Sequence, residues 1–154
     1  MTTADHLRLI DGMRSQEFPT ERVRSGSGAS GPGYHTVSLL MDGELLDEEH
    51  ADGDVDGDEA WRREHRAQCL AEHDALLTLL TLRWGEPSPI SLWSAHERMM
   101  AGEDIPEPWA DPVASCEYLQ LWRVEERWIA LALHLEEEGT GCELIVLVTE
   151  TDPP

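Results

Sequence analysis

Large and apolar side chains recur at helical spacing between residues 58 and 84. They stand three or four residues apart, or at multiples of that step: Trp61, His65, Cys69, Leu76, Leu80 and Trp84. This spacing gathers side chains on one face of a helix. Gly85 and Pro87 follow, and both residue types end helices. The pattern predicts a long helix over about 58–83.

Three later segments change to the period of two that is typical of strands: 117–124, 128–135 and 143–149. In the middle segment Ile129, Leu131 and Leu133 share one face, while Ala130 and Ala132 share the other. Short polar turns at 125–127 and 138–141 separate the segments, so they predict an antiparallel meander with the helix on the leucine side. Residues 34–41 predict a further strand that extends it. The expected fold class is α+β.

The first 32 residues differ from the rest because their four acidic and four basic residues balance. A short helix is expected after Thr3. Residues 25–33 (SGSGASGPG) then have the composition of a flexible linker. We therefore expect a partly flexible N-terminal segment at 1–32 and a single α+β domain at 33–154. The proline-rich stretch 86–115 has little periodicity, apart from a helical turn around 92–100.

Charge is concentrated in what we call the acidic block, Asp42–Glu59. It holds ten of the 32 carboxylates and neither Lys nor Arg, in a chain of net charge −21. Such a run repels itself unless a cation or a basic partner neutralises it. The same charge opposes direct binding to nucleic acid or to an anionic membrane, so the favoured partner is a basic protein.

Part of the acidic block resembles a calcium loop. Asp52, Asp54 and Asp56, with Gly57, match the first six positions of the EF-hand pattern D-x-D-x-D-G. Arg63, however, stands at the twelfth position, where a bidentate carboxylate is required. We expect weak calcium binding or none, and otherwise no cofactor; the alternatives are a loosely ordered cation site and a solvated segment.

His65, Cys69 and His73 lie four residues apart on the expected helix and are candidate zinc ligands. Together they span about 12 Å, which is too far for one ion, so a place along the edge of the core is favoured. The three cysteines, Cys69, Cys116 and Cys142, show no disulfide or metal spacing. Reduced thiols and the lack of a long apolar run predict a cytoplasmic protein. The absence of Lys and Asn, which need A-rich codons, favours a GC-rich bacterial source.

No nucleophile elbow, phosphate loop or HExxH motif occurs, so no catalytic residue is assigned and the protein is not expected to be an enzyme. Trp93 and Trp109 lie among prolines and are candidate interface anchors, although a Trp that covers one end of the sheet is an equal alternative.

The sequence predicts a non-enzymatic acidic module that docks a basic protein, as immunity and inhibitor proteins of similar composition do. The alternatives are an accessory subunit of a larger bacterial assembly and a cation-binding or enzymatic domain that uses the loop 52–58. The oligomeric state stays open. The residues expected to contact the partner are Asp47, Glu48, Glu49, Asp52, Asp54, Asp56, Asp58, Trp93 and Trp109.

Overall fold

The computed structural model describes residues 2–25, 28–40, 55–135 and 142–154, with the backbone alone at 25, 40, 55–62 and 135. Its elements in chain order are α1 (Thr3–Ser15), β1 (Val23–Ser25), β2 (Gly28–Gly31), β3 (Tyr34–Leu40), α2 (Val55–Trp84), β4 (Ser88–Ser91), α3 (Trp93–Met100), α4 (Ala110–Ser115), β5 (Tyr118–Val124), β6 (Arg127–Leu135) and β7 (Cys142–Thr149).

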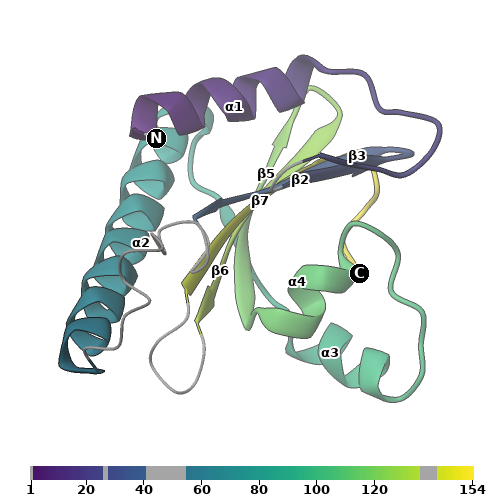
Figure 1. Ribbon diagram of the computed structural model, residues 1–154. Helices are drawn as coiled ribbons and strands as arrows, with labels where there is room; N and C mark the ends of the chain where they lie inside the picture. Colours follow the sequence, from purple (N-terminus) through teal and green to yellow (C-terminus); the bar gives the residue numbers. More distant parts are fainter. Residues whose placement is uncertain (1, 26–27, 41–54, 136–141) are drawn as a thin grey trace.

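The seven strands of the described residues join one antiparallel sheet in the order β1-β2-β3-β7-β6-β5-β4 (Figure 1). The predicted α+β class and C-terminal meander β5-β6-β7 are confirmed. β3 pairs with β7 from Tyr34↔Thr149 to Leu40↔Leu144, so it extends the meander as expected. Since β3 and β4 lie in opposite halves of the sheet, α2 is the crossover that connects them.

α1 and α2 cover one face of the sheet (Figure 1). The predicted stripe on α2 buries Cys69, Leu76 and Leu80 completely, and it packs against Leu131 of β6 and Leu144 of β7. The leucine side of the middle strand therefore faces the long helix, as the alternation predicts. Burial of the apolar contact between α2 and the sheet stabilises this side of the fold.

α3 and α4 cover the other face over β4, β5 and β6 (Figure 1). Here the small Ala130 and Ala132 let the helices approach the sheet, and Trp109 fills the space with no exposed surface. The helical turn expected at 92–100 is α3. Both β4 and α4 were missed, because four- and six-residue elements are too short for periodicity to reveal.

The segment read as a flexible linker contributes strands instead. β2 pairs with β3 from Gly28↔Val37 to Gly31↔Tyr34, and β1 adds to β2. Gly33, at φ +83°, closes the hairpin, and a Cβ on Gly31 would collide with the Tyr34 ring. The glycines thus serve a tight turn and a close ring contact, two needs that composition does not distinguish from flexibility.

Cys69 and Cys142 form a disulfide that joins α2 to the first residue of β7, with Cα atoms 6.4 Å apart. The expectation of three reduced thiols is therefore wrong. The two cysteines lie 73 residues apart, without the spacing that marks a disulfide framework, and only the packing of α2 on the sheet brings them together. Cys116 is the one free cysteine, and it is buried.

The turn between β5 and β6 places two glutamates in left-handed backbone conformations, with φ +51° at Glu125 and +70° at Glu126. A two-residue hairpin of this type favours Asn-Gly, because non-glycine residues pay a steric cost there. We expect Glu126→Gly to raise the free energy of unfolding by about 1 kcal/mol, measured by urea denaturation.

Two control variants separate backbone relief from other effects. Glu126→Gln keeps the strain and removes the charge, so it should leave stability nearly unchanged. Glu97→Gly, inside α3, should lower stability by about 1 kcal/mol. A Glu126→Gly variant no more stable than Glu126→Gln would show that the turn stores no strain.

Candidate functional site

The face of the sheet under α3 and α4 changes from apolar to polar between β7 and β3. One row of paired residues crosses all the strands from β5 to β1: Leu121, Ala130, Leu147, Thr36, Ala29 and Arg24. The next row runs Leu119, Ala132, Ile145 and Ser38. Each row is apolar through β7 and turns polar or small at β3, so the polar half is built to meet solvent or a polar ligand.

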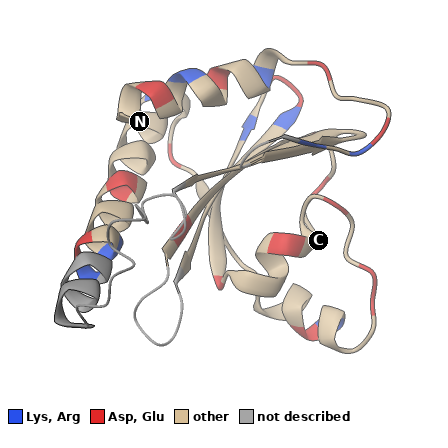
Figure 2. Cartoon of the chain, viewed as in Figure 1, with Lys and Arg blue, Asp and Glu red and all other residues tan. Residues whose placement is uncertain are grey.

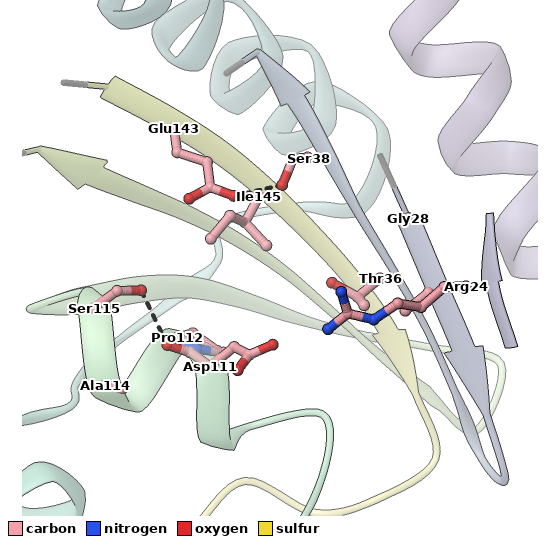
Figure 3. Close-up of a pocket in the computed structure, with 11 residues that line it drawn as sticks. Arg24, Gly28, Thr36, Ser38, Asp111, Pro112, Ala114, Ser115, Glu143 and Ile145 are labelled. Carbon is pink, nitrogen blue, oxygen red and sulfur yellow. Dashed lines mark hydrogen bonds between the residues drawn. The ribbon is translucent and has the colours of Figure 1, made fainter. Parts of the chain in front are cut away.

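A cavity of about 490 Å³ lies where this polar half meets α4, and we call it the β3–α4 cleft. Its volume is within the range of small-ligand sites. Three walls form it: the strands β1–β3, the start of β7, and α4 (Figure 3). The charged and hydroxyl groups that line it are Arg24, Thr36, Ser38, Asp111, Ser115 and Glu143.

Glu143 is held in place at one end of the β3–α4 cleft. The Ser38 hydroxyl donates a hydrogen bond to its carboxylate, with Oγ and Oε1 2.5 Å apart (Figure 3). Between Ser38 and Leu40 the β3–β7 register shifts by one residue, a bulge. The alternation of side chains along β3 buries Leu39 in the core with α2 and leaves Ser38 on the cleft side.

Arg24 extends from β1 toward Thr36 at the other end of the cleft (Figure 3). Within the described part of the chain, the Arg24 side chain makes no ion pair or hydrogen bond. Asp111 and Glu143 line the same cavity, and neither has a cationic partner in the described residues. The β3–α4 cleft therefore holds a guanidinium and two carboxylates that face one cavity without pairing with each other.

No activated nucleophile accompanies these groups among the described residues. The Ser115 hydroxyl donates to the Asp111 carbonyl, 2.9 Å away within α4, and so is engaged. Cys116 lies next to it in sequence, but burial raises the pKa of its thiol above the usual value and the nearby Glu143 carboxylate raises it further, against a lowering by the Ser115 hydrogen bond. The thiol stays protonated at neutral pH, the opposite of what a nucleophile needs. Neither Ser115 nor Cys116 is therefore activated for nucleophilic attack.

The two tryptophans expected to anchor a partner have different positions. Trp93, at the start of α3, is 68% exposed and stays available. Trp109 is fully buried, and its indole donates a hydrogen bond to the Thr151 carbonyl at 3.1 Å. This burial argues against a partner contact by Trp109 and favours the alternative of a core Trp that packs against the sheet.

Most of the acidic block falls outside the described residues, including Asp47, Glu48, Glu49, Asp52 and Asp54. Asp56 and Asp58 lie in the first turns of α2, which begins at Val55. An EF-hand loop needs its fifth to seventh positions in a turn, whereas Asp56, Gly57 and Asp58 are helical. The backbone thus disagrees with the calcium-loop register.

The zinc hypothesis at His65, Cys69 and His73 fails because Cys69 is in the disulfide and has no thiolate to offer. His65 and His73 are both buried, as expected for residues at the edge of the core, and His73 Nδ1 lies 3.3 Å from the Asp74 carboxylate. Among the described residues, no group of three or more His, Cys, Asp or Glu side chains is placed to hold a metal ion.

Sequence reasoning missed the β3–α4 cleft altogether. Its residues come from four separate stretches of the chain, and each one is an ordinary polar residue in its local context. The alternation of Thr36 and Ser38 with Val37 and Leu39 was the one available signal, because it marks a strand with a polar face.

Comparison with protein-family models, with curated proteins and with solved structures finds no match. Within the described residues, none of the helices combines the length and apolar character that a membrane crossing requires.

Proposed function

We propose that the protein is a non-enzymatic, acidic binding module whose partner is a basic protein. The observation that carries the proposal is the shared attachment point of two acidic segments of the chain. β3 ends at Leu40, β6 ends at Leu135 and β7 begins at Cys142, and the pairing Leu135↔Cys142 and Leu40↔Leu144 makes these positions neighbours. We call this end of the sheet the acidic end.

The acidic block attaches to the sheet at Leu40, and the connection 136–141 (EEEGTG) begins and finishes at the acidic end. Neither contains Lys or Arg. By contrast, the Asp and Glu of the described residues are distributed over α1, α2, the loops and α4 (Figure 2). The first half of α2 adds Arg62, Arg63 and Arg66, which offset only part of the charge. A local excess of this size attracts a basic surface and raises its association rate.

The proposal predicts a steep salt dependence that belongs to the acidic block. The partner is first captured from cells of the native source, and its association rate is then measured by stopped flow. Neutralising five block residues (Asp47, Glu48, Glu49, Asp52 and Asp54, to Asn or Gln) should slow association at least tenfold at low ionic strength. The wild-type rate should fall by a similar factor at about 0.5 M salt, where screening is short-ranged.

The matched control neutralises five carboxylates that stand elsewhere: Glu86, Glu97, Asp104, Glu107 and Glu126. All five are exposed and none makes an ion pair with another described residue. Both variants have the same net charge, so only the position of the charge differs. Equal slowing in the two variants would assign the effect to net charge and remove the acidic end from the proposal, as would a partner that is itself acidic.

The same capture distinguishes the accessory-subunit alternative, in which several assembly components are recovered together. The cytoplasmic location and bacterial source expected from the sequence remain predictions. The Cys69–Cys142 disulfide argues against the first of these, because such bonds persist in oxidising compartments.

A further inference from the structure

The charged groups of the β3–α4 cleft are complementary to a ligand that carries both signs of charge. Arg24, Asp111 and Glu143 line one cavity, and their charges are neither paired nor buried in a network among the described residues. A guanidinium left free in such a position can bind a carboxylate through two parallel hydrogen bonds. A carboxylate oriented by a hydroxyl, as Glu143 is by Ser38, can accept from an ammonium or guanidinium.

The spacing of these groups limits the size of the ligand. Arg24 reaches toward Thr36, and Glu143 is bonded to Ser38, two residues further along β3 (Figure 3). Alternate residues of a strand stand about 7 Å apart. The cation and the anion of the ligand must therefore be separated by a similar length, which is too long for the ammonium and carboxylate of one α-carbon. An extended Arg or Lys side chain separates its charge from its own α-carboxylate by about this much.

We propose that the β3–α4 cleft binds the C-terminal residue of the basic partner when that residue is Arg or Lys. The α-carboxylate contacts Arg24, and the basic side chain lies between Glu143 and Asp111. The inference rests on the proposed function for the nature of the partner. It adds a specific contact to the long-range attraction, since the cleft meets the acidic end at Glu143, next to Cys142 in sequence.

The two ends of the cleft have separate roles in this proposal. Capture of a terminal carboxylate is a recurring mode of peptide recognition, and it selects the chain end over an internal basic residue. Ile145, 7% exposed, and Pro112 supply the apolar surface on which the methylene groups of the side chain would pack. Arg24 gives the preference for a free carboxylate, and Glu143 with Asp111 gives the preference for a basic side chain.

The test uses two probes that differ in one group, N-acetylglycyl-L-arginine and its C-terminal amide, titrated by NMR and calorimetry at about 0.15 M salt. Net charge alone favours the amide, because the amide is cationic and the acid is neutral overall, whereas the protein carries −21. Our proposal predicts the reverse order, with the acid about tenfold tighter.

Single variants assign each preference to its residue. Arg24→Gln should abolish the advantage of the acid, while Arg22→Gln, two residues away and outside the cleft lining, should preserve it. Glu143→Gln should weaken the acid about tenfold and reduce its advantage over N-acetylglycyl-L-norleucine, while the exposed Glu86→Gln should do neither. Melting curves verify that each variant is folded.

The outcomes are distinct. Equal binding of acid and amide, tighter binding of the amide, or no binding of either overturns the proposal. Tighter binding of free L-arginine than of the peptide also overturns it, because it assigns the cleft to a free amino acid. If the acidic-block variant slows capture of the basic partner while both probes fail, the proposed function stands and the cleft assignment falls. If the probes bind as predicted but no basic partner exists, the proposed function falls, and the specificity of the cleft for a C-terminal basic residue stands.

Discussion

Replacing Leu131 with Ala should lower the free energy of unfolding by about 3 kcal/mol or more. Leu131 lies in the middle of β6 with 1% of its surface exposed, among Leu76 and Leu80 of α2 and Leu144 of β7. Truncation removes buried methyl groups and leaves a cavity between two rigid layers, and measured costs for such changes range over about 2–5 kcal/mol. Urea denaturation monitored by tryptophan fluorescence gives the value.

Leu82→Ala is the matched control, since the same atoms are removed from a leucine of α2 that is 79% exposed. It should change stability by less than about 0.5 kcal/mol. Neutralising Asp52, Asp54 and Asp56 together should leave stability unchanged or raise it, because it relieves like-charge repulsion. If the triple variant unfolds the protein and Leu131→Ala does not, the acidic block has a structural role and the proposed function is wrong.

The sequence predicts the long helix and the C-terminal meander because their signals are local and repeated. The stripe on α2 extends over several turns, and the alternation on β6 covers the whole strand, so one misleading residue does not obscure either pattern. The strand-like composition of residues 34–41 predicted that this strand extends the meander, but it did not predict that the partner is β7. Periodicity alone was therefore enough for the fold class and for the face that the helix covers.

Residues 25–33, the Gly/Ser-rich segment, adopt a structure that local sequence patterns do not predict. β1 and β2 have few large side chains, and what holds them is pairing with β3 and the fit of Gly31 under the Tyr34 ring. A glycine-rich composition is found both in flexible linkers and in close-packed hairpins, so it does not distinguish the two. Trp109 was misjudged for a related reason, because its hydrogen-bond partner Thr151 lies 42 residues away.

The candidate site could not be predicted from the sequence, because its residues come together only in the folded sheet. Arg24, Thr36 and Glu143 come from β1, β3 and β7, and Asp111 comes from α4. Charge density drew attention to the acidic block, which in our proposal is where a basic partner is attracted. It does not say which groups recognise that partner, because recognition depends on geometry, and geometry comes from the register of distant strands.

Reduction of the Cys69–Cys142 disulfide should destabilise the protein by about 4 kcal/mol. The bond closes a loop across 73 residues, and cross-links of this length remove much of the conformational entropy of the unfolded chain. Both cysteines are buried in the core shared by α2 and the sheet, so the folded state keeps its packing when the bond is absent. The effect should therefore be seen as lower stability rather than as a different fold.

Guanidinium unfolding with and without a phosphine reductant measures this difference, and thiol titration counts the cysteines. The unfolded, unreduced protein should show one reactive thiol, from Cys116, and the reduced protein three. The double variant Cys69→Ala/Cys142→Ala is the control, because reductant should leave its stability unchanged. Three thiols before reduction, with superimposable unfolding curves, would show that the bond does not form.

The disulfide also fixes the start of β7, because Cys142 directly precedes Glu143. The reduced protein should therefore bind the arginine probe more weakly than the oxidised protein. In the Glu143→Gln variant, reduction should change probe binding little.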